Sequence, residues 1–165
     1  MPADAKNTPP SPQIIKPSGE LKRKAPLGRV ELSAALALAQ HVIAEQGKDY
    51  PQRLNEDIAK LKALYVAIKA VPDQRSLKDL SYLSHDMKGQ GTTFGFDLVT
   101  LICDMLCNYL DKLEAVTPHA LEVIGVHVDA LALVAHEGLK GMGGPAGEVL
   151  IKGLHKVLEK EIKKA

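Results

Sequence analysis

A histidine, a lysine and two glycines stand close together near the middle of the chain, at a spacing that suits phosphoryl transfer. They are His85, Lys88, Gly89 and Gly95. A neutral imidazole is a nucleophile near neutral pH, and it becomes a good leaving group once it is phosphorylated. The ammonium group of a nearby lysine would offset the negative charge of the phosphoryl group. His85 is therefore the first candidate for chemistry in this chain.

The segment from Asp73 to Gly89 predicts a helix that presents His85 to solvent, with Asp73 as its cap. Its apolar residues lie on one stripe when each residue advances by about 100°. They are Leu77, Leu80, Leu83 and Met87. His85 lies opposite the stripe, and its neighbours one turn away, Ser81 and Gly89, are small enough to let another protein approach. From spacing alone, the simpler interpretation is a surface histidine on a solvated helix face.

The same residues fit a longer motif, His-x-x-Lys-Gly-x-x-x-x-x-Gly. The run Gly-Thr-Thr-Phe-Gly-Phe at 91–96 belongs to the match, and so do three residues of the following segment: Leu98, Cys103 and Leu106. On these residues, the stretch 81–114 resembles the histidine-containing phosphotransfer (HPt) domains. It is especially similar to the phosphotransfer domain of chemotaxis histidine kinases. Outside this stretch only the helical pattern agrees.

The resemblance implies a role for each matched residue. His85 would accept the phosphoryl group through Nε2, with Lys88 close to that group. Gly95 would allow a tight turn into the next helix. We expect a partner to dock around the histidine, at Ser81, Tyr82, Gly89, Gln90 and Gly95. Met87 and Phe94 fit either this docking surface or the core.

One position departs from the family pattern. HPt domains commonly carry Glu or Gln twenty-two residues after the histidine, where it hydrogen-bonds Nδ1, and this chain has Cys107 there. A thiol is a weak hydrogen-bonding partner. The candidates for holding Nδ1 are therefore Cys107, Asp104 and Asn108, with water or no partner at all as alternatives.

The chain shows no ATP-binding motif, so we expect a phosphocarrier rather than an enzyme. The resemblance implies that it takes a phosphoryl group from an aspartyl phosphate on one receiver domain and passes it to another receiver. Its partners would be response-regulator receiver domains and a hybrid histidine kinase. The receiver would supply Mg²⁺, and we expect no metal site and no cofactor in this chain.

Two other interpretations stay open. The chain could be a helical adaptor with a degenerate HPt site that is not phosphorylated, and Cys107 would then be a sign of that loss. It could also be a phosphotransfer module cut from a larger kinase, although a tail followed by a complete bundle favours a free-standing protein.

Composition indicates a small protein of the cytoplasm. The 165 residues carry a net charge of +1, which argues against nucleic acid or an anionic membrane as the main partner, and we expect a monomer. The apolar stretch 123–135 is too short to span a membrane and is interrupted by polar residues. Cys103 and Cys107, one helical turn apart, suggest no disulfide framework and fit a reducing compartment.

The fold class predicted from the helical periodicity is all-α. Residues 1–29 contain six prolines and six basic against two acidic residues, which predicts a disordered basic tail. A helical domain would follow over 30–165. We expect helices over 30–46, 52–71, 73–89, 98–115, 118–137 and 147–163, with Gly47 ending the first. The middle four would form an antiparallel four-helix bundle, HPt-like, with additional N- and C-terminal helices.

Overall fold

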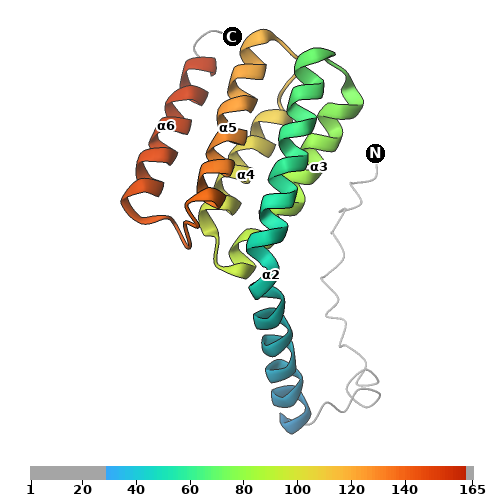
Figure 1. Cartoon of the computed structure of the whole chain (residues 1–165), viewed down its shortest axis with the longest axis vertical. Coiled ribbons are helices and arrows are strands. Elements are labelled where there is room, and N and C mark those ends of the chain that lie inside the picture. The colour runs from blue at the N-terminus through green and yellow to red at the C-terminus, as the bar shows by residue number, and fades with distance from the viewer. Residues whose placement is uncertain (1–28, 163–165) are drawn as a thin grey trace, which may run out of the picture. The chain divides into compact units, whose positions relative to one another are not determined.

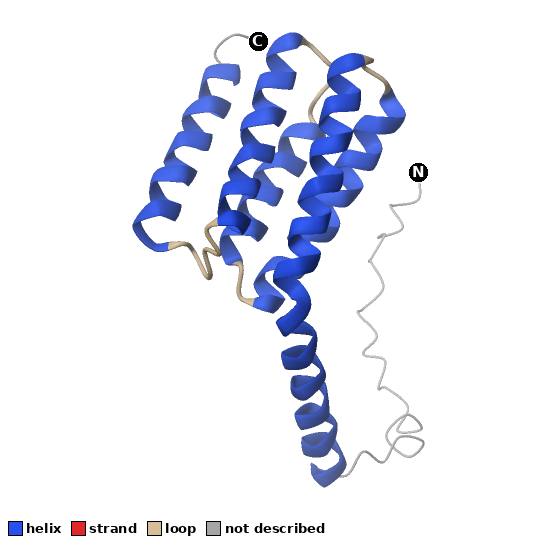
Figure 2. Ribbon diagram, in the orientation of Figure 1, coloured by secondary structure: helices blue, strands red, loops and turns tan. Residues whose placement is uncertain are grey.

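The computed structural model describes the backbone of residues 29–162 and the side chains of residues 32–160. Over these residues it contains five α-helices, one short 3₁₀ turn and no strand, so the all-α prediction is confirmed (Figures 1 and 2). The elements are α2 (Arg29–Ala70), α3 (Gln74–Gly91), η1 (Thr92–Phe94), α4 (Asp97–Leu110), α5 (Pro118–His136) and α6 (Gly144–Ile162). The chain divides into two compact units, 1–38 and 39–165. The tail predicted over 1–29 lies almost entirely outside the described residues.

The helix break predicted after Gln46 is wrong, because α2 is continuous through Gly47 and Pro51. A proline inside a helix removes one backbone hydrogen bond and costs about 3 kcal/mol. Burial on both sides of the proline offsets this cost, since Tyr50 and Leu54 are almost fully buried. The ring of Tyr50 also stacks on Phe94, with 4.6 Å between the centroids. The predicted additional N-terminal helix is therefore the first part of α2.

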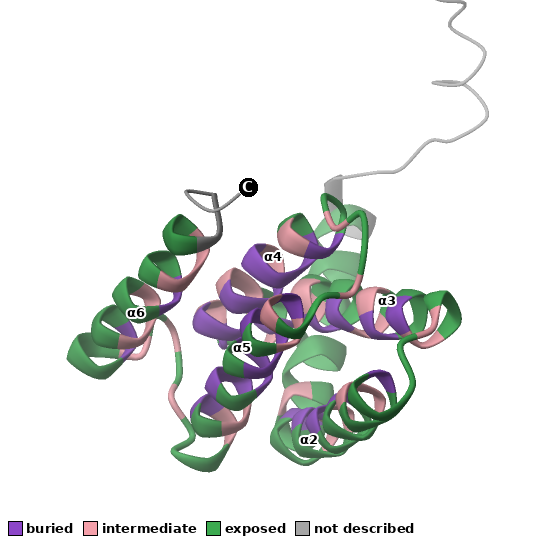
Figure 3. Ribbon diagram, turned by 90° about the horizontal axis from the view of Figure 1, so that it is seen from above, coloured by how far each residue is buried: buried purple, intermediate pink, exposed green. Residues whose placement is uncertain are grey.

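In the unit 39–165, α2 to α5 surround a common core, and α6 lies outside them beside α5. Figure 3 shows this arrangement, with the buried faces of α2 to α5 turned toward one another. The larger side chains that are almost wholly buried in it include Leu54, Leu61, Ile68, Leu80, Met87, Leu98, Ile102, Leu106, Ile124 and Leu131. Short connections join the helices, so successive helices are antiparallel. The C-terminal helix predicted as an addition is α6.

Two helix starts follow from side-chain caps. Asp73 Oδ1 accepts hydrogen bonds from the backbone N–H groups of Arg75 and Ser76, both at 2.9 Å. Thr117 Oγ1 accepts from the N–H of Ala120 at 3.0 Å. Each cap satisfies N–H groups that have no partner within the helix itself. The cap at Asp73 fixes where α3, the helix that carries His85, begins.

Glycine allows α3 to approach α4 closely. A Cβ atom at Gly91 would collide with Oγ1 of Thr100 and would lie 2.9 Å from both the carbonyl oxygen of Phe96 and the amide nitrogen of Thr100. Backbone atoms cannot move aside as a flexible side chain would. The end of α3 and the start of α4 can therefore meet only because residue 91 has no side chain.

Helix α5 is the one element within residues 29–162 that is long and apolar enough to cross a membrane, by length and composition. Half of the apolar window in α5 is buried inside the structure. Helices at the core of a soluble protein pass the same test. Its polar residue His127 is fully buried, and Nδ1 of that ring donates to the carbonyl of Val123 at 2.8 Å.

We predict that Gly91→Ala lowers the free energy of unfolding by about 1–3 kcal/mol, because the new methyl group overpacks the contact between α3 and α4. Urea denaturation measures this. The matched control is Gly89→Ala in the same helix, where a Cβ atom would meet nothing within 4 Å. It should leave stability unchanged or raise it by about 0.5–1 kcal/mol. Equal losses in both variants would contradict the close contact.

We also predict that stability falls as the pH drops below about 6.5. Burial lowers the pKa of His127 below its usual value of 6.5, and the hydrogen bond to Val123 opposes this only in part. Below pH 6.5 the unfolded chain binds a proton that the folded chain resists, so acid favours unfolding. The loss continues down to the lowered pKa. In His127→Gln, the unfolding free energy should depend less steeply on pH over this range. An unchanged slope would contradict the assignment.

Candidate functional site

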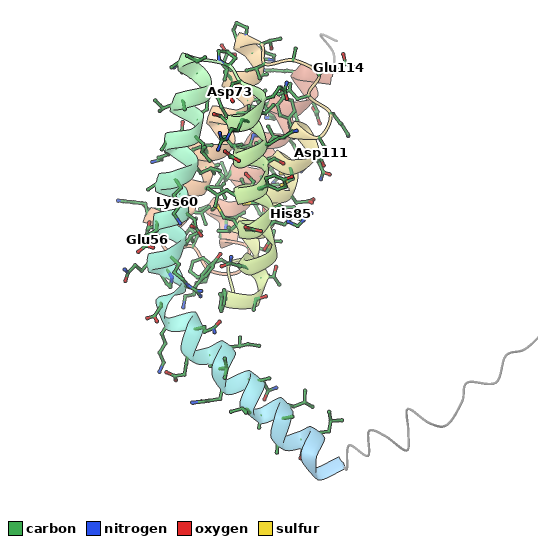
Figure 4. All side chains as sticks on the ribbon, turned by 90° about the vertical axis from the view of Figure 1, so that its right-hand side faces the viewer. Glu56, Lys60, Asp73, His85, Asp111 and Glu114 are labelled. Atoms are coloured by element: carbon green, nitrogen blue, oxygen red, sulfur yellow. The ribbon has the colours of Figure 1, made fainter. Side chains whose placement is uncertain are left out.

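His85 lies on the exposed side of α3. The buried residues of that helix are Leu77, Leu80, Ser84, Met87 and Gly91, so the exposure expected for the histidine is confirmed. Figure 4 shows His85 on the outer side of the helix. Within the described part of the chain, neither ring nitrogen makes a hydrogen bond or an ion pair. Both nitrogens are therefore open to a visiting group.

The residues expected to dock a partner reach the surface to different extents. Tyr82 is highly exposed, and Ser81 and Gln90 are partly buried. Gly89, one turn after His85, is exposed, and a Cβ atom there would meet nothing within 4 Å. Because no side chain projects from residue 89, a partner can approach His85 from the side of Gly89.

Met87 and Phe94, for which the sequence left open either the docking surface or the core, both pack against the interior. Met87 is 2% exposed. Phe94 is partly buried between Tyr50 and the guanidinium group of Arg53, which lies 5.2 Å from the centre of its ring. Such a cation–π contact adds to the attachment of η1 to α2. Both residues therefore pack against the interior, and neither forms part of the exposed surface that carries His85.

A left-handed glycine forms the turn between η1 and α4. Gly95 has φ = +79°, a conformation that residues with a side chain adopt at a cost. Its carbonyl accepts from the N–H of Gly141 at 2.7 Å, and the carbonyl of Gly141 accepts from the N–H of Leu98 at 2.8 Å. The loop before α6 thus fixes this turn.

Lys88 forms an ion pair with Asp104 of α4. The distance from Nζ to Oδ1 is 2.6 Å, and both side chains are 38% exposed. The hydrogen bond to Asp104 is the main reason that the pKa of Lys88 is raised, and the negative charge of Asp111 acts in the same direction. The ammonium group of Lys88 is therefore held by a carboxylate of α4.

The backbone at Lys88 is fixed by Thr100. Oγ1 of Thr100 donates to the carbonyl of Lys88 at 3.0 Å and accepts from the N–H of Thr92 at 2.8 Å. One hydroxyl thus ties the last turn of α3 to the first turns of α4. Sequence reasoning missed Thr100 and Gly91, because their role depends on how two helices align rather than on spacing within either one.

None of the three candidates for the Nδ1 partner of His85 makes that bond in the structure. Asp104 is paired with Lys88, and Asn108 is exposed. Cys107 is buried, and burial is the largest cause of its raised pKa. The thiol therefore stays protonated near neutral pH and offers only a weak hydrogen bond.

The described residues contain no group of three or more His, Cys, Asp or Glu side chains that could hold a metal ion. Cys103 and Cys107 are both free and buried. An open groove of about 380 Å³ runs between α4 and α6, with Leu101, Met105 and Leu158 among its walls. Asp104 lines this groove and also holds Lys88, so the groove adjoins the candidate site.

Comparisons with protein-family models, with curated proteins and with solved structures find no match for this chain.

We predict that Asp104→Asn lowers the pKa of Lys88, because the substitution removes the carboxylate that stabilises the ammonium form. NMR titration of the lysine side-chain carbons measures this. Asp111→Asn is the matched control, since Asp111 has the smallest of the effects on Lys88. It should shift that pKa much less. Equal shifts would contradict the assignment of the ion pair.

Proposed function

We propose that this protein carries phosphoryl groups between the aspartates of receiver domains in a two-component phosphorelay. The observation that carries the proposal is His85, an exposed imidazole that has no partner among the described residues and lies one turn before Lys88 in the sequence of α3. The match to the HPt motif at His85, Lys88, Gly89 and Gly95 supports it. The site belongs to a helical bundle, which is the scaffold that the resemblance implies.

In the transfer step, Nε2 of His85 attacks the phosphorus of an aspartyl phosphate on a receiver domain. The N–P bond forms as the bond from phosphorus to the aspartate oxygen breaks, and the aspartate leaves as a carboxylate. The proton on Nδ1 stays on the ring. In the reverse step an aspartate of a second receiver takes the phosphoryl group. The imidazole of His85 then returns to its neutral form and is ready for another cycle.

Lys88 would change partners during this cycle. In the free protein its ammonium group is held by Asp104. A phosphoryl group on His85 would bring a second anion within one helical turn of Lys88. Charge-assisted hydrogen bonds to phosphoryl oxygens are strong enough to compete with a half-exposed ion pair. Lys88 would then stabilise the phosphorylated state.

The receiver partner would supply Mg²⁺ and the remaining catalytic groups, so this chain would be a phosphocarrier rather than an enzyme. Its small or exposed neighbours, Ser81, Tyr82 and Gly89, leave room for the receiver to reach His85. A hybrid histidine kinase would stand upstream. Such a relay operates in the cytoplasm, where we place the protein.

The position of Cys107 favours one second candidate, a helical adaptor that is not phosphorylated. The family's usual hydrogen-bonding residue is missing there, and the ring of His85 has no other partner to orient it within the described residues. An adaptor would bind its partners without taking up phosphate.

We predict that His85→Ala abolishes phosphoryl uptake while leaving the fold unchanged, because the side chain is exposed. The assay incubates each variant with receiver domains of the same organism that carry radiolabelled phosphate. It then looks for label that is acid-labile and alkali-stable. His136→Ala is the control, since it removes another exposed histidine, and it should keep full uptake. A wild-type chain that takes no label from any receiver would favour the adaptor.

A further inference from the structure

Asp104 of α4 holds the lysine that follows His85 on α3. Oδ1 of Asp104 is 2.6 Å from Nζ of Lys88, and both side chains are 38% exposed. His85 lies three residues before Lys88, a spacing that makes two side chains neighbours on the surface of a helix. The ammonium group of Lys88 can therefore reach either the carboxylate of Asp104 or a group carried on His85.

A phosphoryl group on His85 would encounter the carboxylate of Asp104 in one of two ways. If Lys88 turned to the phosphoryl oxygens and left Asp104, the ion pair would be lost. If Lys88 kept both partners, the two anions would share one ammonium group and lie only about 5 Å apart, since its donors accept partners at hydrogen-bond distance. Anions that close repel each other. In both cases the carboxylate makes the phosphorylated state less stable.

The other acidic groups near Lys88 act on it less than Asp104 does. Asp111 lies seven residues further along α4, and its charge has the smallest effect on the pKa of Lys88. Cys107 is buried, and burial raises the pKa of its thiol, which therefore carries no charge near neutral pH. Asp104 is thus the group whose charge Lys88 would have to share with a phosphoryl group.

We infer that Asp104 weakens the hold of this site on the phosphoryl group, and so makes phosphorylated His85 a better donor. This role rests on the proposed phosphotransfer function, in which the carrier must release its phosphoryl group to the next aspartate. Asp104 is a positioning residue, since it acts through Lys88 rather than on the phosphoryl group directly. Water reaches the ion pair and screens it, so the effect is modest.

The exchange equilibrium with phosphoramidate tests this role on the full chain. Phosphoramidate transfers its phosphoryl group to Nε2 of His85 as its own P–N bond breaks and ammonia leaves. Fixed concentrations of phosphoramidate and ammonium chloride therefore set the ratio of phosphorylated to free His85. Phosphorus NMR measures this ratio, and the His85→Ala chain identifies the signal that belongs to His85.

We expect Asp104→Asn to raise the ratio of phosphorylated to free His85 about two- to fivefold, the range that corresponds to loss of a partly exposed ion pair. Asp104→Glu keeps the negative charge and should stay close to the wild type. Asp111→Asn is the matched control, because it removes another carboxylate of α4, and it should also stay close to the wild type.

A double substitution separates this role from damage to the fold. In a chain that already carries Lys88→Gln, Asp104→Asn should change the ratio much less than it does alone, because the residue through which Asp104 acts is gone. Circular dichroism should show equal helix content in all variants, since both side chains reach the surface.

The inference is overturned if Asp104→Asn lowers the ratio or leaves it unchanged, or if Asp111→Asn raises it equally. It is also overturned if neither the wild type nor Asp104→Asn is phosphorylated at His85. Phosphoramidate needs no receiver domain, so the role of Asp104 is measured separately from the relay. Failure of the relay would appear instead as a phosphohistidine at His85 that no receiver can discharge.

Discussion

The contact between the end of α3 and the start of α4 is the constraint on which the candidate site depends. Gly91 lets the two backbones meet, and the hydroxyl of Thr100 ties the carbonyl of Lys88 to the N–H of Thr92. This contact sets the register between the helices. The register places Asp104 opposite Lys88. The period of α3 itself turns His85 outward while Met87 enters the core. A looser contact would leave the imidazole exposed but would separate it from a positioned cation.

In the free protein the positive and negative charges at the site offset each other. Lys88 is neutralised by Asp104, whereas His85 has no partner within the described residues. A phosphoryl group on His85 would add negative charge near Lys88, whose side chain is 38% exposed and can therefore be reached by that group. Cys107 adds no charge to the site near neutral pH. Burial raises its pKa more than the nearby lysine lowers it.

The exposure of His85 and the all-α fold could be predicted from the sequence, because both follow from the period of a single helix. The pair of Lys88 and Asp104 could not, since it depends on how two helices align. The break predicted within α2, after Gln46, was wrong for a related reason. Gly47 and Pro51 are local signals that end a helix, but the burial of Tyr50 and its stacking on Phe94 outweigh them. Tertiary packing decided both cases.

The most direct test of the central claim is to treat the chain with phosphoramidate, a small donor of phosphoryl groups, and to locate the product by phosphorus NMR and peptide mass spectrometry. We expect one phosphohistidine, bonded through Nε2 of His85, that loses its phosphoryl group when an unphosphorylated receiver domain is added. Equal modification of other exposed rings such as His136, or a phosphohistidine at His85 that no receiver can discharge, would contradict it.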